Sequence, residues 1–236
     1  MNAMTAFKQC LQHLGDWFFP SFCVQCQCVV NSDYSLCEHC LADLSLLDLR
    51  EHPNLLYRPD IVELFPDCQF DHLFACAWYR SPFDNWLSQL KFSNQIHYKK
   101  ALSLIISLQF TSSKQASETW PELFIILPLH QQRFLKRGFN QVAQCWLPSL
   151  ENEHVDFISL QRSKKTQAQS SLSKAKRIKN LHGAFICNTD MTGKTVAIID
   201  DVMTTGATLN AATVALKQAG AKQVWAFVTC LTPLGD

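Results

Sequence analysis

The fold is decided by the stretch Val196-Ala-Ile-Ile-Asp200-Asp201-Val-Met-Thr204-Thr205-Gly206-Ala-Thr-Leu209. An apolar run, expected as a buried strand over 195–200, ends in two carboxylates. A loop of small residues then leads into a helix expected over 207–218. Free backbone N–H groups and the positive end of the helix dipole meet at that loop, which favours a bound anion.

The residue types in this stretch suit a sugar phosphate. The residues expected to bind the phosphate are Thr204, Thr205, Gly206, Ala207 and Thr208. The glycine permits close approach of the backbone, and the threonine hydroxyls can donate to phosphate oxygens. The carboxylates of Asp200 and Asp201 can accept hydrogen bonds from a vicinal diol. A site that holds a monophosphate and a diol this close together is built for ribose 5-phosphate.

Two other interpretations of the stretch are weaker. In the first, the acids only cap the next helix and the loop is an ordinary turn. Capping uses one acid, however, and not two adjacent acids followed by three threonines. In the second, Gly193-Lys194-Thr195 ends a P-loop, but residue 188 is Asn where that motif requires Gly, and the triplet precedes a strand.

Strands and helices alternate around this stretch. Strands are expected over 73–79, 122–129, 195–200 and 223–230, with a short one over 156–160. Helices are expected over 82–90, 98–110, 140–146 and 207–218. Residues 51–70 are expected to be an irregular connector, and residues 111–119 a polar loop. Apolar strands that alternate with helices predict an α/β fold whose parallel sheet is covered on both faces.

Length and composition exclude several classes of protein. The chain has 236 residues, of which 47% are hydrophobic and 17% charged, with a net charge of +1. This composition excludes intrinsic disorder, and no apolar stretch approaches the roughly 18 residues of a membrane span. Residues 1–19 lack the continuous apolar core of a secretory signal, so we expect a cytoplasmic protein whose thiols stay reduced.

Eleven cysteines are unusual for such a protein, and five of them fall within 18 residues. Four of these form two CxxC pairs: Cys23, Cys26, Cys37 and Cys40. Two such turns bring four thiolates together around one Zn²⁺ ion, which supplies folding energy to a module too small for its own core. Cys28 or His39 could replace one ligand, although neither fits the spacing as well. A site closed by four cysteines is structural and not catalytic.

Residues 196–209 resemble the phosphoribosyl-diphosphate (PRPP) binding motif of the type I phosphoribosyltransferases. Other stretches resemble one branch of that superfamily, the ComF/GntX-like proteins with an N-terminal zinc ribbon. These stretches are the doubled CxxC, residues 79–91 (YRSPFDNWLSQLK), 127–141 (LPLHQQRFLKRGFNQ) and 166–185. Together they cover nearly the whole chain, and the run RGFNQ at 137–141 specifies the branch.

The resemblance implies a type I phosphoribosyltransferase-like parallel sheet flanked by helices over 73–236, a connector over 51–72 and a small N-terminal zinc-ribbon module over 1–50. Asp200 and Asp201 would be the catalytic acids that hold the ribose hydroxyls, and residues 204–208 would hold the 5-phosphate. The pyrophosphate, with its Mg²⁺, would meet the loop after Pro128 and the side chains of Arg133 or Arg137. The implied reaction is displacement of pyrophosphate by a nitrogen nucleophile of an unknown acceptor.

The near-neutral total hides a basic segment over 157–189. It has seven cations and no Asp or Glu, so the net charge of the rest of the chain is −6. The cations are Arg162, Lys164, Lys165, Lys174, Lys176, Arg177 and Lys179. Three interpretations remain open: a solvated loop, a lid that brings Lys164 or Lys165 to the pyrophosphate, or a contact with a nucleic-acid backbone. Aromatic residues for base stacking are scarce there, which weakens single-strand recognition.

The resemblance leaves two functions open, because the family is associated with natural competence, DNA uptake and the use of DNA as a nutrient. One is a phosphoribosyltransferase. The other is a non-catalytic accessory protein of DNA uptake, with a sensing or vestigial PRPP site and a zinc module that docks a partner. Two unpaired carboxylates favour retained PRPP binding. Glutamine amidotransferase activity is not expected, because the chain starts Met-Asn-Ala and lacks an N-terminal cysteine nucleophile.

Overall fold

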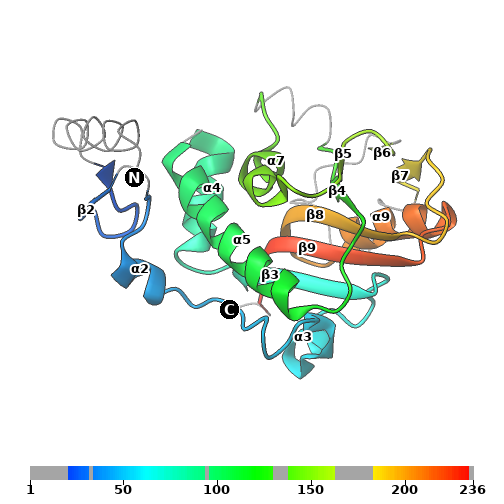
Figure 1. Ribbon diagram of the computed structural model, residues 1–236, viewed down its shortest axis with the longest axis horizontal. Helices are drawn as coiled ribbons and strands as arrows, with labels where there is room; N and C mark the ends of the chain where they lie inside the picture. Colours follow the sequence, from blue (N-terminus) through cyan, green and yellow to red (C-terminus); the bar gives the residue numbers. More distant parts are fainter. Residues whose placement is uncertain (1–20, 32–33, 94–95, 130–137, 163–182, 234–236) are drawn as a thin grey trace, which may run out of the picture.

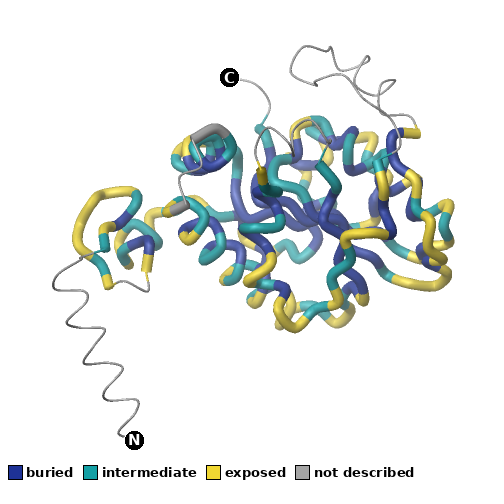
Figure 2. The backbone as a smooth tube through the Cα atoms, turned by 90° about the horizontal axis from the view of Figure 1, so that it is seen from above, coloured by how far each residue is buried: buried dark blue, intermediate teal, exposed yellow. Residues whose placement is uncertain are grey.

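The computed structural model describes residues 21–31, 34–93, 96–129, 138–162 and 183–233. Most of these residues surround one central sheet (Figure 1). Residues 21–31 and 34–42 of the N-terminal part, which include the paired cysteines, lie at one end of the molecule, away from the sheet (Figures 1 and 2). Among the helices within the described ranges, none combines the length and the apolar character needed to cross a membrane.

The sheet has five strands in the order β3-β9-β8-β4-β5, and every neighbouring pair is parallel. The strands are β3 (His72–Trp78), β9 (Gln223–Leu231), β8 (Thr195–Met203), β4 (Leu123–Ile126) and β5 (Val155–Asp156). Residues in the middle of these strands are almost fully buried (Figure 2) because helices cover both faces. The predicted fold class is therefore confirmed.

The helices are α4 (Phe83–Ser93), α5 (Ile96–Ala116), α7 (Gln141–Trp146) and α9 (Ala207–Gln218), with the 3₁₀-helix η2 (Leu147–Leu150) after α7. The chain passes from β8 through α9 to β9 on one side, and from β4 through α7 to β5 on the other side, so the two connections run in opposite directions across the sheet. Because parallel crossovers are right-handed, α9 and α7 lie on opposite faces. Helices α4 and α5 share the face of α7 (Figure 1).

Aromatic side chains form the centre of the core on the α5–α7 face. Phe74 of β3 and Phe227 of β9 stack with 4.8 Å between ring centroids, and Phe124 of β4 meets Phe227 at 5.7 Å. Trp146 of α7 packs edge-on against Phe227, and its indole N–H donates to Thr229 Oγ1 over 3.1 Å. This cluster fixes α7 against three strands, and α7 leads into the candidate site.

Several predicted boundaries were wrong. Strand β4 ends at Ile126 and not at 129, and α4 continues to Ser93 and not to 90. The polar residues after Phe110 continue α5 to Ala116, because this stretch has no glycine or proline and its polar side chains lie mostly on the solvent side.

The single strand expected over 156–160 is two strands. Asp156 ends β5 by accepting the backbone N–H groups of Ile158 and Ser159, and β6 (Leu160–Arg162) then pairs antiparallel with β7 (Phe185–Cys187). Strand β8 extends to Met203, so the acid pair lies within it.

The segment after the cysteine pairs is more ordered than its irregular pattern indicates. It contains the 3₁₀-helix η1 (Leu55–Tyr57) and α3 (Pro59–Leu64), in which Leu55 and Ile61 are fully buried. The Asn54 side chain joins η1 to the sheet, since its Oδ1 accepts the backbone N–H groups of Leu56 and Leu73.

Residues 46 and 47 extend the sheet at the free side of β3. Leu46 forms an antiparallel bridge with Ala77, and the backbone N–H of Leu47 donates to the Cys76 carbonyl over 2.9 Å. The side-chain amide of Gln109 on α5 donates to the carbonyls of Leu47 and Cys76. This short segment is therefore held by both β3 and α5.

Gly220 offers a test of the turn between α9 and β9. Its φ is +99°, and a Cβ there would lie 2.6 Å from Thr192 Oγ1 and 3.0 Å from Thr192 Cα. Gly220→Ala should therefore lower the free energy of unfolding by about 2 kcal/mol or more, through steric overlap added to left-handed strain. Urea denaturation measures this change.

Gly193 supplies the matched control. Its φ is +77°, but a Cβ would have no neighbour within 4 Å. Gly193→Ala should cost about 1 kcal/mol from backbone strain alone. Equal losses in the two variants would contradict the expected overlap at Thr192.

Candidate functional site

The topology of the sheet places a crevice at the carboxyl ends of β8 and β4. These strands are neighbours, yet the chain leaves β8 towards β9 and leaves β4 towards β5. In open parallel sheets, ligands bind where the connections diverge in this way. Strand β8 presents Asp200 and Asp201 at this point, and β4 leads into Leu127 and Pro128. The topology and the sequence motif thus indicate the same place.

The two acids lie on opposite faces of the sheet, because successive strand residues alternate. Asp201 faces α4 and α7, where its Oδ2 lies 2.6 Å from Lys91 Nζ and accepts a hydrogen bond from Gln141 Nε2 over 3.0 Å. Its Oδ1 accepts the backbone N–H of Val202 over 2.8 Å. The expectation of two unpaired carboxylates was therefore wrong for Asp201, since a single sequence does not show which residue of a distant helix will face it.

The environments of the acids separate their pKa values. Burial and the charge of Asp201 raise the pKa of Asp200. Burial alone would also raise the pKa of Asp201, but the Lys91 ammonium and the Gln141 amide outweigh it and hold that pKa below its usual range. The negative charge of the pair is therefore concentrated on Asp201.

The loop after β8 has the features of an anion site. Gly206 is the N-cap of α9 with a φ of +71°, and it has no side chain with which to cap the helix. The first turn of α9 contains no acidic residue. Thr205 Oγ1 makes only a long contact of 3.4 Å with the backbone N–H of Ala207. The five predicted phosphate-binding residues thus lie together, in this loop and in the first turn of α9.

This geometry coincides with a family match. A model of the phosphoribosyl transferase domain matches residues 141–234, from the start of α7 past the end of β9. The chain contains a phosphoribosyl transferase domain. The residues of that domain that sequence reasoning singled out, the acid pair and the loop, lie within the matched segment.

Relatives that match most of the chain are named for DNA utilization and competence. DNA utilization protein YhgH of Shigella flexneri is 29% identical over 93% of this chain and 92% of its own length. Competence protein F of Haemophilus influenzae is 29% identical over 86% of this chain and 88% of its own length. Competence protein ComFC of Streptococcus pneumoniae is 26% identical over 84% of this chain and 88% of its own length. These proteins are homologues of the chain over most of its length.

A solved structure is also similar in part. A hypoxanthine phosphoribosyltransferase of Staphylococcus aureus aligns with 58% of this chain and 68% of its own, at 15% identity and a TM-score of 0.35. The fold assignment rests instead on the family match and on the sheet topology.

Two residues that contact the Asp201 carboxylate were not predicted as site residues, namely Lys91 and Gln141. Lys91 follows a run of buried residues on α4 and lies four residues after Leu87, so it shares the buried face of that helix. A lysine at helical spacing with core residues was the available signal. Gln141 carried no comparable signal beyond its place in the RGFNQ run.

Four predicted candidates for the pyrophosphate contact lie outside the described residues: Arg133, Arg137, Lys164 and Lys165. The described parts of the basic segment include β6 and β7, which flank residues 163–182. Arg162 at the end of β6 has its guanidinium 5.4 Å from the centre of the Phe185 ring. This cation of the segment therefore contacts an aromatic ring of the chain itself.

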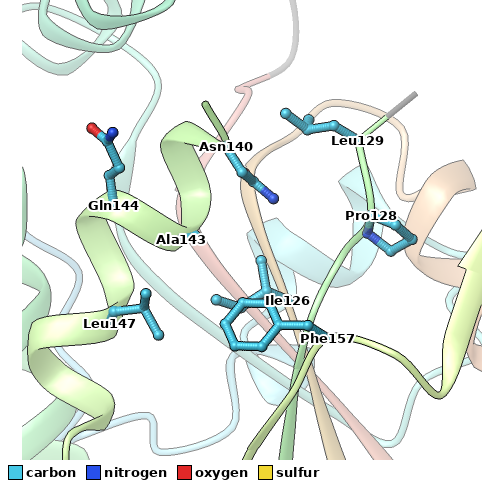
Figure 3. A pocket seen from close by; sticks show the side chains of 8 residues that line it. All are labelled: Ile126, Pro128, Leu129, Asn140, Ala143, Gln144, Leu147 and Phe157. Carbon is cyan, nitrogen blue, oxygen red and sulfur yellow. The ribbon is translucent and has the colours of Figure 1, made fainter. Parts of the chain in front are cut away.

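An apolar pocket lies on the α7 side of the crevice (Figure 3). Its volume is about 460 Å³, and its lining residues are Ile126, Pro128, Leu129, Asn140, Ala143, Gln144, Leu147 and Phe157. No charged side chain is among them, so the pocket suits an apolar or aromatic part of a ligand better than a phosphate. Asn140 caps α7, because its Oδ1 accepts the backbone N–H of Val142.

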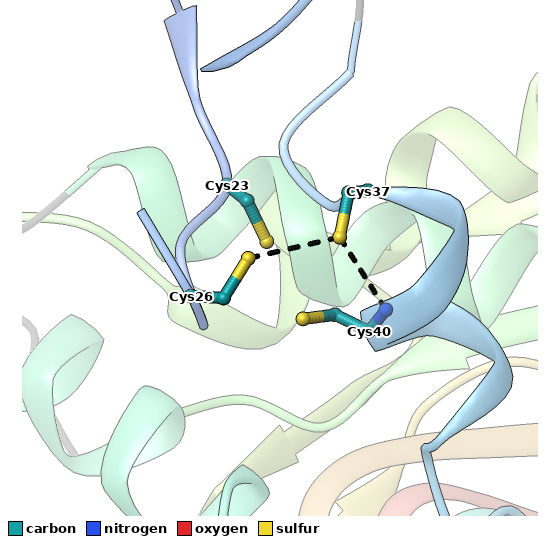
Figure 4. A group of neighbouring side chains, drawn as sticks. All are labelled: Cys23, Cys26, Cys37 and Cys40. Atoms are coloured by element: carbon teal, nitrogen blue, oxygen red, sulfur yellow. Dashed lines mark hydrogen bonds between the residues drawn. The ribbon is translucent and has the colours of Figure 1, made fainter. Parts of the chain in front are cut away.

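The paired cysteines form a second candidate site (Figure 4). The sulfur atoms of Cys23, Cys26, Cys37 and Cys40 all lie within 4.8 Å of one another and could hold a metal ion. The first pair lies between the short strands β1 (Ser21–Phe22) and β2 (Val29–Val30), and the second pair lies at the start of α2 (Glu38–Ala42). The backbone N–H of Cys40 donates to Cys37 Sγ over 3.4 Å, which orients that sulfur.

Metal content tests this cluster. The purified protein should contain about one metal ion per chain, because four converging thiolates complete a tetrahedral site. Cys37→Ser should lose most of the metal and lower the melting temperature, as measured by elemental analysis and calorimetry. Cys187→Ser on β7 is the control, and Cys28→Ser tests the fifth thiol, which lies beside Cys26 and Cys37 but outside the group of four. Loss of metal in Cys28→Ser alone would reassign the ligand set.

Proposed function

We propose that the protein binds Mg²⁺–PRPP at the carboxyl ends of β8 and β4 and transfers its phosphoribosyl group, in the uptake of DNA or its use as a nutrient. The acid pair that leads through a glycine loop into α9, within a phosphoribosyl transferase domain, is the observation that carries the proposal. The homologues named for DNA utilization and competence support the biological setting.

The proposal gives each site residue a role. The 5-phosphate lies against the loop residues 204–206 and the first turn of α9, where backbone N–H groups and the helix dipole stabilise its charge. Asp200 and Asp201 accept hydrogen bonds from the ribose hydroxyls. The pyrophosphate lies towards the loop after Pro128, with Arg133, Arg137, Lys164 and Lys165 as the candidate cations. The carboxylates also stabilise the positive charge that develops on the ribose when pyrophosphate departs.

The N-terminal module has a structural role in this proposal. We assign residues 1–50 to it, residues 51–72 to the connector and residues 73–236 to the transferase-like domain. Four thiolates within 4.8 Å suit Zn²⁺, which prefers tetrahedral sulfur coordination. All four positions are then taken by the protein, so the ion stabilises the module and leaves no position for a substrate.

A second function deserves the same test, because the homologues are named for DNA and not for a transferase reaction. In this alternative the chain is an accessory protein of DNA uptake, and its PRPP site senses the metabolite or is vestigial. The two functions predict different outcomes with Mg²⁺–PRPP, since a transferase must release pyrophosphate when an acceptor is present.

Isothermal titration with Mg²⁺–PRPP tests the binding site. At a pH of about 8.5, where Asp200 is ionised although burial and Asp201 raise its pKa to about 7, the native protein should bind. Asp200→Asn should then weaken the affinity about 10- to 100-fold, because hydrogen bonds to a charged acceptor contribute about 1.5–3 kcal/mol. Asp200→Asn is cleaner than Asp201→Asn, which would leave Lys91 without its partner. Glu118→Gln is the control, because Glu118 is exposed and precedes the amino end of β4, whereas the site lies at the carboxyl ends of the strands. No binding by the native protein would overturn the proposal.

A separate measurement addresses DNA. If the basic segment contacts the nucleic-acid backbone, fluorescence anisotropy should show an affinity that falls steeply with salt. Neutralising Lys164, Lys165, Lys174 and Lys176 should reduce both the affinity and its salt dependence. An affinity that survives these four changes would place any DNA contact elsewhere on the protein.

A further inference from the structure

Lys91 is an unusual lysine, because its charged end is turned into the protein. It is on α4, its side chain is only 17% exposed, and the side chain of its partner Asp201 is only 13% exposed. Taking both charges out of water is costly, and an apolar pair of similar size often stabilises a fold as well. The retained ion pair at the carboxyl end of β8 therefore points to a role beyond packing.

Gln141 reaches the same carboxylate from the other side of the crevice. It is the first residue of α7 and only 3% exposed, and its Nε2 donates to Asp201 Oδ2. Its Oε1 is buried and has no hydrogen-bond partner among the described residues. A buried acceptor without a donor is unfavourable. A ligand hydroxyl at the crevice would supply that donor.

Hydrogen-bond capacity shows how much of Asp201 is left for a ligand. An ionised carboxylate has about four acceptor positions. Within the described chain, Oδ2 accepts from Lys91 and Gln141, Oδ1 accepts from Val202, and the Asp200 carboxyl lies within reach of a side-chain hydrogen bond with Asp201. An ionised Asp200 cannot donate, so about one position on Oδ1 then remains for a ligand, and its direction is set by the groups that hold the other three.

We infer that Lys91 and Gln141 are positioning residues, which hold the Asp201 carboxylate ionised and oriented so that it accepts one ribose hydroxyl of PRPP. This inference rests on the proposed function and divides the acid pair into unequal parts. Asp201 is the fixed acceptor, and Asp200 on the opposite face is the group whose proton can change. The neutral Gln141 carbonyl can accept a second hydroxyl beside the fixed acceptor.

Other titratable groups face Asp201, and their contributions have to be separated from that of Lys91. Asp200 is adjacent on β8, Cys145 comes from α7, and Cys230 comes from β9. Burial raises the pKa of both thiols, so they stay neutral near neutral pH. Among the described residues, Lys91 is thus the cation that acts on this carboxylate, and removing it should change the protonation of the acid pair.

The test compares Lys91→Met, Lys91→Arg and Gln141→Leu in titrations with Mg²⁺–PRPP across the pH range. Without Lys91, burial and Asp200 raise the pKa of Asp201, so binding should be lost from a higher pH as acid is added. We expect Lys91→Met to weaken binding about tenfold or more near neutral pH and to move the acid side of the profile up by about one unit. Lys91→Arg should keep most of the native affinity and most of the native pH profile, and Gln141→Leu should weaken binding severalfold.

Lys100→Met is the matched control, because Lys100 is exposed on α5. A purely structural lysine would change the melting temperature without moving the pH profile. Native affinity with a native pH profile in Lys91→Met would overturn the inference, while the native protein would still support the proposed function. If Lys91→Met does not fold, Gln141→Leu is the deciding variant. Native affinity and a native pH profile in Gln141→Leu would then overturn the inference.

Carbon NMR of aspartate-labelled protein without ligand gives an independent reading, with Asp201→Asn to assign the Asp201 carboxyl signal. That carboxyl should stay ionised into acid in the native protein and titrate at a higher pH in Lys91→Met. If the native protein does not bind PRPP, the proposed function fails, and this titration still decides whether Lys91 controls the charge of Asp201. Identical titrations in the two proteins would overturn that control.

Discussion

The buried ion pair between Lys91 and Asp201 ties together elements that lie far apart in the sequence. A carboxylate near the end of a buried strand must find a partner or lose its charge. Here the partner comes from α4, more than one hundred residues earlier in the chain, and α7 adds the Gln141 amide. The position of both helices over the sheet is thus coupled to the charge of one side chain.

The crevice itself depends on the order of the strands. Since β8 and β4 are neighbours whose connections run in opposite directions, the chain diverges at their carboxyl ends and leaves a crevice between them. The aromatic cluster around Phe227 holds α7 on one face, and the glycine N-cap begins α9 on the other. The polar site therefore lies between two helices whose positions are set by the core and by the backbone.

Much of this arrangement could be predicted from the sequence, because the decisive signals were local. Apolar strands such as 195–200 and 223–230 alternate with helices, and the paired CxxC spacing places four sulfurs together before any tertiary contact is known. The acid pair and the glycine loop were also visible as one contiguous motif. These features depend on neighbours in the chain, which a sequence displays directly.

The parts that could not be predicted depend on contacts between distant residues. The pairing of Asp201 with Lys91 requires the packing angle of α4, which no local pattern specifies. The extension of α5 to Ala116 and the burial of Leu55 and Ile61 are similar, since polar or proline-containing stretches become ordered where a folded surface supports them. The local sign of such a pair is a lysine within the apolar face of a helix, as Lys91 is on α4.

The short segment at Leu46 and Leu47 has a consequence for the solubility of the protein. Strand β3 is at the side of the sheet and is buried and apolar along most of its length, so an uncovered backbone there would invite pairing with another chain. The antiparallel bridge to Ala77 and the hydrogen bond to the Cys76 carbonyl occupy part of that backbone. A transferase-like domain trimmed to begin after residue 50 would lose this cover, and its exposed edge would favour aggregation.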